Sequence, residues 1–431
     1  MSDTTLEHFT ATFATTERLS PGDMARYRGR ALERLARHAR AQVPFYRARL
    51  DALFDSADRF VPEAWREVPI FTRPQAQQQV DALRAARVPE QAGATVEGQT
   101  SGSTGMSFHH ARSALADLAS NAMTTRLHRW HGLDFDKRLA RITIDWSGRA
   151  VLPDGLCGGP WSREGTGEGW HLGIEGSDAA QQAAWLRRVA PSYLLSYPTA
   201  ALAILRAAAE QGPPLPLEAV LTTGEVIGDD TRREIAGLSG GRVVDAYGTQ
   251  ELGQIAGQCP QAPHYHVCAE SQFVEIVDAA GDPVPAGAPG RLVVTSFYNF
   301  AMPFIRYDTG DLATAGAASC VCGRTLPTIA RILGRQRHMF TFPGGRSIWP
   351  QASSVEMLRH VPSRQFQIAQ TAPLAVEYRY VPQQPGQSED RAALAAYLRR
   401  QFDPRIDVSF RPCETIARLP GGKYQEYVRD F

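Results

Sequence analysis

The sequence predicts an α/β protein built on a largely parallel sheet, followed by a β-rich segment and a smaller α+β piece. Between about residues 138 and 248, short apolar runs alternate with helix-like stretches, a pattern typical of strand–helix–strand units. After Gln272 the pattern changes to strands joined by tight turns, and the segment from about Gly334 carries its own strand and helix signals. At 431 residues the chain is long enough for two or three domains.

The elements follow in chain order. Residues 22–53 place basic and apolar side chains at helical spacing, which predicts one or two amphipathic helices with a break at Pro44. The α/β region and the β-rich region that follows it then predict strands and helices at these positions: strands 138–146, 192–198, 218–224, 242–248, 273–278 and 290–297, and helices 180–190, 199–211 and 229–237.

Composition excludes several classes of protein. The 46 basic and 45 acidic residues nearly cancel, so bulk charge indicates no nucleic-acid or membrane partner. No apolar stretch is long enough to cross a bilayer, and the start lacks the pattern of a secretory signal. Six cysteines in a chain of this length do not indicate a disulfide framework, so we expect a cytoplasmic protein with reduced thiols.

Two glycine-containing stretches suggest a nucleotide site. In "GQTSGSTGMSF" (98–108), backbone N–H groups and hydroxyls can converge on phosphates, although the stretch alone could be a flexible linker. In "VVDAYGTQELG" (243–253), a strand runs into a Tyr-Gly turn at the end of a sheet, where α/β proteins bind ligands. Glu251 could hold a divalent cation there, or could simply be a solvated glutamate.

Two further stretches add to this indication. In "FIRYDTGDL" (304–312), Asp311 follows a glycine and could accept hydrogen bonds from a ribose diol, or form an ordinary Asx turn. In "ILGRQRH" (332–338), a Gly-Arg pair could form a hinge, or simply a linker. The chain has only two lysines, Lys137 and Lys423, and the second follows two glycines near the end, in "LPGGKYQEYVRDF".

In this order the stretches resemble the core motifs of the adenylate-forming (ANL) superfamily. The chain is most similar to its phenylacetate–CoA ligase branch, which includes CapK-like and coenzyme F390 synthetase-like members. The resemblance covers nearly the whole length. The supporting segments are "VPFYRARL" (43–50), "REVPIFTR" (66–73), "PSYLLSYPTAA" (191–201), "LTTGEVI" (221–227) and "CVCGRTLP" (320–327). The resemblance implies the ANL fold: a large N-terminal domain, residues 1–333, with a β-rich subdomain at about 259–333, and a small mobile domain, residues 334–431.

The resemblance also implies a role for each matching residue. The phosphates of ATP would be wrapped by Ser101, Gly102, Ser103, Thr104 and Gly105. The adenine site would be lined by Gly224, Glu225, Asp245, Ala246 and Tyr247, and the turn continues through Gly248, Thr249 and Gln250. Glu251 would hold Mg²⁺ and Asp311 the ribose. Arg335 would contact ribose or phosphate, and Lys423 would reach the carboxylate and the α-phosphate.

Four positions depart from the family pattern. Gln250 stands where Thr or Ser is usual, Arg337 where Asp or Lys is usual, and Arg73 where Lys is usual. The phosphate loop continues as Met106-Ser107 without the usual Lys-Pro. These departures keep a second interpretation open, in which the chain binds nucleotide without turnover.

Four residues form a candidate zinc set: Cys259, His266, Cys320 and Cys322. Three thiolates and one imidazole complete a tetrahedral site for structural zinc. When "HVCAE" is aligned with the family's "HVHAE", the resemblance implies that His266, and not His264, is the imidazole ligand. Cys268 is then not a ligand. For Cys157 and Cys413 we expect buried, reduced side chains.

The resulting prediction is an AMP-forming acid–thiol ligase. It would use ATP and Mg²⁺ to convert a carboxylic acid, aromatic by resemblance, to an acyl-adenylate, and then pass the acyl group to CoA or to the phosphopantetheine of an acyl carrier protein. An amine or another nucleophile as acceptor is the alternative. The N-terminal helices would also allow a homodimer.

Overall fold

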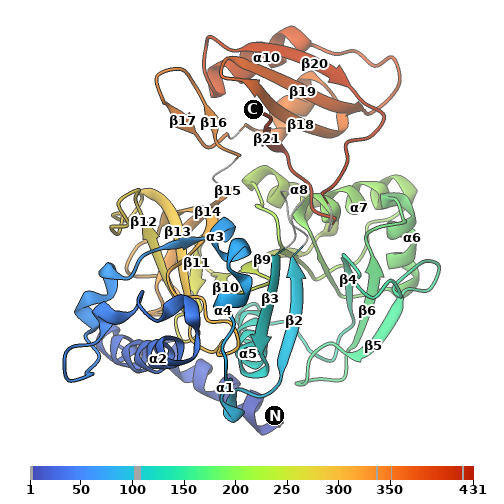
Figure 1. Ribbon diagram of the computed structural model, residues 1–431. Coiled ribbons are helices and arrows are strands. Elements are labelled where there is room, and N and C mark those ends of the chain that lie inside the picture. The colour runs from blue at the N-terminus through green and yellow to red at the C-terminus, as the bar shows by residue number, and fades with distance from the viewer. Residues whose placement is uncertain (1–2, 101–107, 336–337, 351, 420–421) are drawn as a thin grey trace. The chain divides into compact units, whose positions relative to one another are not determined.

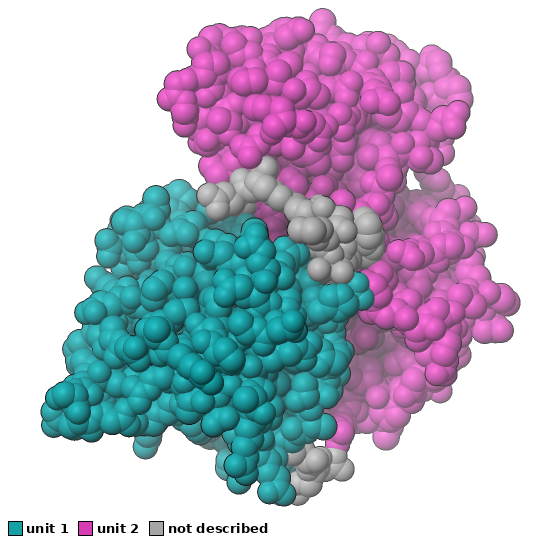
Figure 2. All heavy atoms as spheres, viewed as in Figure 1, with its two compact units in different colours: residues 1–133, 245–333 teal, residues 134–244, 334–431 magenta. Residues whose placement is uncertain are grey.

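The computed structural model describes residues 3–100, 108–335, 338–350, 352–419 and 422–431 (Figure 1). The chain divides into two compact units, shown in two colours in Figure 2. The first unit contains residues 1–133 and 245–333, and the second contains residues 134–244 and 334–431. One cut falls after Leu333, and the predicted division into domains 1–333 and 334–431 stays a prediction. The grouping of residues 134–244 with the C-terminal segment was not predicted.

The first unit starts with helices and ends with strands. Helix α2 begins after Ser20, whose hydroxyl accepts the N–H of Asp23, and it ends at Gln42, directly before the predicted break at Pro44. The elements of this unit are α1 (Asp3–Thr16), α2 (Pro21–Gln42), η1 (Pro44–Tyr46), η2 (Asp51–Leu53), η3 (Pro62–Glu67), β1 (Phe71–Thr72), α3 (Arg73–Gln78), α4 (Val80–Leu83), η4 (Glu90–Ala92), β2 (Thr95–Thr100), β3 (Phe108–Ser113), α5 (Ala114–Trp130), β9 (Arg242–Thr249), β10 (Gly253–Gln258), β11 (Tyr265–Val267), β12 (Gln272–Val277), β13 (Pro289–Ser296), β14 (Tyr307–Ala315) and β15 (Thr328–Arg335).

The strands of this unit follow the order β12-β13-β14-β15-β11-β10-β9, with β1 added in parallel to β14. The pairs β12–β13, β13–β14, β10–β11 and β9–β10 are antiparallel, which confirms the β-rich character predicted after Gln272. An aromatic core supports the sheet: the rings of Phe71, Phe304 and Tyr307 contact one another. Tyr46 joins them, and its hydroxyl donates to the carbonyl of Pro303 at 2.9 Å.

The second unit begins with the predicted parallel sheet. Its strands follow the order β5-β6-β4-β7-β8, and the pairs β4–β6, β4–β7 and β7–β8 are parallel. The predicted strands and helices of this region are confirmed, and β5 and β6 are additional strands in glycine-rich sequence. The elements are β4 (Leu139–Thr143), β5 (Leu156–Pro160), β6 (Glu168–Gly173), α6 (Ala179–Val189), β7 (Tyr193–Ser196), α7 (Pro198–Gln211), β8 (Ala219–Thr223) and α8 (Asp229–Ser239).

Local signals set the ends of these helices. Asp178 and Gln181 form a capping box at the start of α6. Pro198 occupies the first turn of α7, where a backbone N–H would make no hydrogen bond within the helix, so proline is tolerated there. Gly240, with φ +69°, ends α8 in the left-handed region. The helices pack on β4, β7 and β8 and cover the buried sheet residues, among them Ile142, Leu194 and Val220.

The C-terminal segment of the second unit has a separate four-stranded sheet and its own apolar core. Strands β18 and β19 form an antiparallel pair, while β20 and β21 add in parallel on either side. The elements are β16 (Phe340–Thr341), β17 (Ser347–Ile348), α9 (Ser354–His360), β18 (Ser363–Ala372), β19 (Ala375–Pro382), α10 (Arg391–Gln401), β20 (Asp407–Pro412) and β21 (Tyr427–Arg429). None of the helices in the described ranges is long and apolar enough to cross a membrane.

Candidate active site and metal centre

The predicted phosphate-binding residues, Ser101, Gly102, Ser103, Thr104 and Gly105, lie outside the described residues, and so does Arg337. The strands on either side of the predicted phosphate loop are described. β2 and β3 pair antiparallel from Thr95 opposite Ser113 to Thr100 opposite Phe108. In the middle of this pair, a Cβ on Gly98 would lie 2.5 Å from Nε2 of His110, so the close approach of His110 requires glycine there.

The residues predicted to bind adenine and ribose are joined directly. The hydroxyl of Tyr247, on β9, donates to Oδ2 of Asp311 at 2.7 Å. We expected Asp311 on a turn, and that is wrong because it lies within β14. Three residues of β14, 309–311, stand opposite a single residue of β13, and Gly310 with φ +77° accommodates the bulge. Bulges re-aim side chains next to functional sites, so a position on a strand is compatible with the role predicted for Asp311, which stays a prediction.

Glu251, the predicted Mg²⁺ ligand, is buried with only 2% of its surface exposed. Its Oε1 accepts a hydrogen bond from the hydroxyl of Tyr307 at 3.1 Å and lies 3.5 Å from a guanidinium nitrogen of Arg73. Burial lowers the pKa of the nearby His110, and the charge of Glu251 opposes that shift.

Asp245 and Gly248 have structural roles on β9. The hydroxyl of Tyr265 donates to Oδ2 of Asp245 at 2.5 Å, and the backbone N–H of Asp245 donates to Oε1 of Gln258 at 3.0 Å. The side chain predicted to line the adenine site is therefore already engaged. A Cβ on Gly248 would lie 2.5 Å from the carbonyl oxygen of Gly253, so the β9–β10 pair requires a glycine there. Ala246, between them, is half-buried.

Thr249 and Gln250 lie at the end of β9, beside a cavity of about 340 Å³. The hydroxyl of Thr249 accepts the N–H of Leu252 at 3.2 Å, and the carbonyl of Gln250 accepts a hydrogen bond from Arg112 at 3.2 Å. The side chain of Gln250 is exposed. His110 and Arg112 also line the cavity, so two basic side chains lie near the turn where the prediction places the phosphates.

The second unit brings Gly224, Glu225 and Lys423 together, although about 200 residues separate them in the sequence. Gly224 has φ +80°, and a Cβ there would lie 3.2 Å from Cε of Lys423. The next residue, Glu225, accepts the backbone N–H of Tyr424. The turn that carries Lys423 therefore docks on the "TTGEV" segment after β8.

Glu225 is the centre of this docking. Its Oε2 accepts the N–H and the hydroxyl of Thr199 at 3.1 and 2.8 Å, and Arg418 lies 3.8 Å from Oε1. Arg418 also donates to the carbonyl of Gly422 at 2.9 Å, which holds the turn from its other side. Burial raises the pKa of Glu225, and its hydrogen bonds and Arg418 oppose that shift.

Three aromatic residues of the central part of the chain, Tyr197, Trp146 and Trp130, lie in three different places. Tyr197 is buried next to Gly224, and a Cβ on Gly422 would lie 3.4 Å from its ring, so it supports the docked turn. Trp146 is 60% exposed. Trp130 contacts His266 and donates to Glu17 at 2.6 Å, which places it beside the cysteine cluster.

The Gly334-Arg335 pair lies at the end of β15, where the unit boundary falls. Gly334 has φ +105°, and a Cβ there would lie 2.6 Å from the ring of Trp349. Only glycine fits this backbone without displacing the indole. Arg335 is half-buried on the same strand.

The four predicted zinc ligands come together in the first unit. Ligand atoms of Cys259, His266, Cys320 and Cys322 all lie within 4.8 Å of one another. The two sulfurs of Cys259 and Cys320 are 3.6 Å apart, and Sγ of Cys322 is 3.2 Å from Nε2 of His266. Zinc–sulfur bonds of about 2.3 Å in a tetrahedron place neighbouring sulfurs slightly less than 4 Å apart, so the donor set fits zinc in chemistry and in spacing.

The other cysteines, and His264, differ from the four cluster residues in burial or position. Cys268 is buried, and burial raises the pKa of its thiol to about 12. His264 lies 3.1 Å from Cys320 but is half-exposed, whereas His266 is fully buried. The expectation that Cys157 and Cys413 are buried is wrong: Cys157 is exposed on β5 and Cys413 is half-exposed. Cys157 lies within the edge strand β5 and Cys413 follows the edge strand β20, and one side of an edge strand faces solvent.

Several side chains around these sites carried no sequence signal. Arg112, Arg418 and Tyr424 contact predicted site residues through backbone atoms or through charge, and no spacing rule marks such contacts. One clue was available for Arg418 and Tyr424, which flank the conspicuous Lys423 within five residues.

No protein-family model matches the chain. The phenylacetate-coenzyme A ligase of Thermus thermophilus is 31% identical over 134 residues, which are 30% of this chain and 30% of that protein. The match thus spans less than a third of the curated relative's length.

Among solved structures, 2-hydroxyisobutyryl-CoA ligase in its postadenylation state matches with a TM-score of 0.72 at 20% identity, covering 93% of this chain and 88% of that one. The anthranilate CoA ligase AuaEII, in complex with anthranoyl-AMP, matches with a TM-score of 0.52 at 17% identity, covering 76% and 65%.

These likenesses give the fold, which is that of the adenylate-forming enzymes. Together with the order of the motifs they support the resemblance to the adenylate-forming enzymes. Part of its sequence is similar to the phenylacetate–CoA ligases within that superfamily.

Proposed function

We propose that the protein is an AMP-forming acid–thiol ligase. It would activate a carboxylic acid with ATP, release pyrophosphate, and pass the acyl group from the acyl-adenylate to the thiol of CoA or of a carrier-protein phosphopantetheine. The phenylacetate and anthranilate ligases among the similar proteins favour an aromatic acid.

The docking of the Lys423 turn on Gly224 and Glu225 is the observation that carries this proposal. The family pattern gives these two distant motifs to one adenylate-forming site, and here they are in contact. In the same way, Tyr247 and Asp311, assigned to adenine and ribose, share a hydrogen bond.

Formation of an acyl-adenylate requires a positive charge close to the reacting carboxylate and phosphate. Attack of a carboxylate on the α-phosphate brings two anions together, so catalysis depends on positioning and on neutralising charge. The ammonium of Lys423 is a compact charge on a flexible stem, and it can follow the charge as it moves to the bridging oxygen. Gly422 directly before it has φ +73°, a conformation that glycine adopts readily.

Glu251 would hold Mg²⁺ in this proposal. Mg²⁺ takes few protein ligands when it binds with substrate phosphates, so one buried carboxylate is enough, and its role would be to neutralise phosphate charge. Arg73, 3.5 Å from Glu251, would share that carboxylate with the ion. An arginine here supplies a permanent positive charge in place of the lysine usual in the family.

Pyrophosphate release tests the function. The protein is incubated with Mg²⁺-ATP and a panel of aryl and alkyl acids, with and without CoA. We expect acid-dependent release that becomes catalytic when CoA is present. A single turnover without CoA dependence would favour a carrier protein or an amine as acceptor, and no acid-dependent release across the panel would contradict the proposal in favour of nucleotide binding without turnover.

Lys423→Ala tests the catalytic assignment. Removing a charge that stabilises the transition state should lower adenylation by about 10²–10³-fold or more, while ATP binding, measured by calorimetry, persists. Lys137→Ala is the matched control, because Lys137 is the other lysine of the chain and pairs with Glu218 on the surface at 2.7 Å. Near-normal activity of Lys423→Ala would contradict the assignment.

We also propose that Cys259, His266, Cys320 and Cys322 hold a structural zinc ion. Three thiolates and an imidazole in a closed set leave no open position for substrate, so the ion would stabilise the fold of the β-rich segment. Elemental analysis should find about one zinc per chain in the purified protein and none in Cys322→Ser. Cys413→Ser should keep its zinc. Protein without stoichiometric metal would contradict the assignment.

A further inference from the structure

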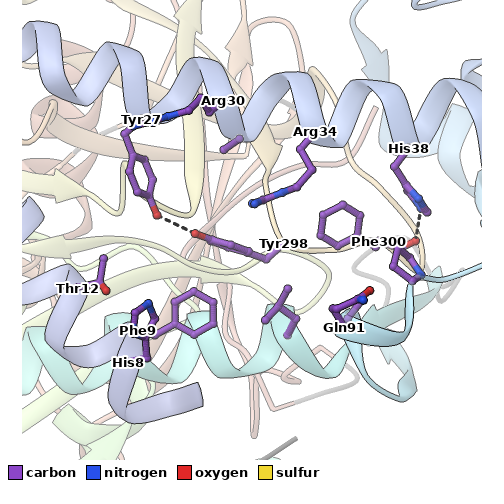
Figure 3. A pocket seen from close by; sticks show the side chains of 14 residues that line it. His8, Phe9, Thr12, Tyr27, Arg30, Arg34, His38, Gln91, Tyr298 and Phe300 are labelled. Carbon is purple, nitrogen blue, oxygen red and sulfur yellow. Dashed lines mark hydrogen bonds between the residues drawn. The ribbon is translucent and has the colours of Figure 1, made fainter. Parts of the chain in front are cut away.

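A hollow of about 770 Å³ lies in the first unit, between α1, α2 and the segment 298–300 (Figure 3). None of the residues assigned above to ATP or to metal lines it. The buried rings of Phe9, Tyr298 and Phe300 form part of its wall. Its volume falls within the range of small-molecule sites, which are mostly apolar with a few polar groups that converge.

The ionisable groups of the hollow, apart from its two tyrosines, are basic. Arg30 and Arg34 lie one turn apart on α2, His8 and His38 complete the set, and no acidic residue lines the hollow. Other arginines of α2 have carboxylate partners: Arg26 pairs with Asp23, Arg37 with Glu33 and Asp58, and Arg40 with Asp58. Among the residues that the structure describes, no carboxylate pairs with Arg30 or Arg34. Arg28, which lies over the ring of Phe273, has no ion pair there either, so Arg30 and Arg34 are distinguished by lining the hollow without a counter-charge.

Arg34 lies over aromatic rings. Its guanidinium carbon is 5.8 Å from the centre of the Tyr298 ring and 5.9 Å from that of Phe300, and Figure 3 shows the side chain extending toward Tyr298. Stacking of this kind orients the planar guanidinium and leaves its N–H groups at the edge for a ligand.

A pair of tyrosines adds a donor. The hydroxyls of Tyr27 and Tyr298 are 2.8 Å apart (Figure 3). Each hydroxyl carries one proton, and their mutual hydrogen bond uses only one of the two. Within the described part of the chain, no acceptor for the second proton is present, so the pair offers a hydroxyl donor beside Arg34.

We propose that this hollow binds a small amphipathic carboxylate, a molecule with an apolar body and one carboxylate group. The carboxylate would accept hydrogen bonds from Arg34 and from the tyrosine pair, with Arg30 adding charge. The apolar body would lie against Phe9, Tyr298 and Phe300. A guanidinium matches the two oxygens of a carboxylate, and an aryl or alkyl body fits the rings.

Photo-labelling of the full-length protein tests this site. The probe is 4-benzoylbenzoate, which carries a photoreactive aromatic body and one carboxylate, and labelled peptides are mapped by mass spectrometry. We expect labels in peptides of α1, α2 or residues 297–301. The uncharged analogue 4-benzoylbenzamide should label them about tenfold less. Competition with 2-naphthoate and with decanoate distinguishes an aryl carboxylate from a fatty acid as the preferred ligand.

Variants separate the site from general labelling. Arg34→Gln should reduce labelling of these peptides about tenfold and Tyr298→Phe should reduce it less, while Arg34→Lys should retain part of it because it keeps the charge. Arg26→Gln is the matched control on the same helix and should label like the unchanged protein. Arg34 is exposed, so its substitution should leave the fold intact, which the thermal midpoint checks.

Two results would overturn the proposal. One is equal labelling by the acid and the amide, or equal labelling of the Arg34→Gln and Arg26→Gln variants. The other is a change of oligomeric state in Arg34→Gln, measured by sedimentation, without any carboxylate-dependent labelling, because the hollow would then be covered by a second copy of the chain. Neither result depends on adenylation, so the test stands apart from the proposed enzymatic function.

Discussion

Glu225 acquires a role that its motif did not suggest. The family pattern places it at the adenine, but here its carboxylate accepts from Tyr424 and Thr199 and lies near Arg418, so it anchors the turn that carries Lys423. A residue that acts by positioning Lys423 should matter only for the step in which Lys423 takes part. That step is the formation of the adenylate.

We therefore expect Glu225→Gln to slow adenylation by about tenfold or more. The amide has only one acceptor oxygen, whereas the carboxylate of Glu225 accepts hydrogen bonds at both of its oxygens. Transfer of a supplied acyl-adenylate to CoA should remain close to normal. The two half-reactions are measured separately, by pyrophosphate exchange and by thioester formation. Glu218→Gln, which removes a surface partner of Lys137 in the same unit, is the control. Equal loss in both half-reactions would indicate a general structural defect instead.

Glu426 gives the molecule a pH dependence. Burial, and after it the charge of Glu225, raises the pKa of Glu426 from its ordinary 4.5 to about 7, while Arg206 opposes the shift. The folded state then binds a proton that the unfolded state releases, so the contribution of Glu426 to stability is complete below pH 4.5 and is lost as the pH rises through about 7.

Glu426→Gln should remove this loss. The variant should be more stable than the unchanged protein at pH 8, by about 1–2 kcal/mol, with a smaller difference at pH 5. Denaturant midpoints at the two pH values measure it. Glu414→Gln, an exposed glutamate of the same unit, should change neither midpoint. A difference that does not grow with pH would show that the carboxylate is not the cause.

At the scale of elements, Arg306 holds the start of β14 against the segment after η3. Its buried side chain pairs with Glu275 on β12 at 3.1 Å and donates to the carbonyls of Arg66 and Val68 at 2.9 and 2.8 Å. Its backbone has φ +50°, a conformation that few non-glycine residues adopt, so these contacts must hold it there.

Arg306→Met should lower the free energy of unfolding by about 3–5 kcal/mol, because it leaves Glu275 buried without its partner. The double variant Arg306→Met with Glu275→Met should recover part of the loss, since no unpaired charge remains. Chemical denaturation of the four proteins in this cycle measures the coupling. The control Arg66→Met removes an exposed ion pair, in which Arg66 lies 3.8 Å from Asp282. It should change the free energy of unfolding by less than about 0.5 kcal/mol. A full loss in the double variant would contradict this account.

The strand and helix predictions succeeded where burial repeats along the chain. In α7 and β7, apolar residues recur at the helix or strand period, and these elements lie within a residue or two of the predicted bounds. Strands β5 and β6 were missed because "LCGGP" and "EGWHLG" have little apolar period, and pairing with neighbours makes them strands.

At the scale of the molecule, three separate apolar cores support the fold. The first unit has one, residues 134–244 have a second, and the segment after residue 339 has a third. The cysteine cluster lies within the first unit, and its side chains come from β11, the residue after β10, and the loop before β15. A metal there joins segments that are far apart in sequence.

Metal removal should therefore act locally. With a strong zinc chelator, we expect amide hydrogen exchange to increase in peptides of residues 255–333, while peptides of the β18–β19 pair keep their protection. Hydrogen-exchange mass spectrometry with and without chelator measures this, and added zinc should restore the original rates. Unchanged exchange in residues 255–333 would argue against a bound metal, and a uniform increase would argue against local action.

The sequence by itself determined the α/β class, the resemblance to the adenylate-forming enzymes and the residue types of the candidate sites, because periodic burial and the order of short motifs are properties of the chain alone. Tertiary structure decided what those residues contact. It tied Glu225 to the Lys423 turn, placed Asp311 on a bulged strand, and set Arg34 over the rings of Tyr298 and Phe300. These contacts join residues that are distant in sequence, and no local pattern records a distance in space.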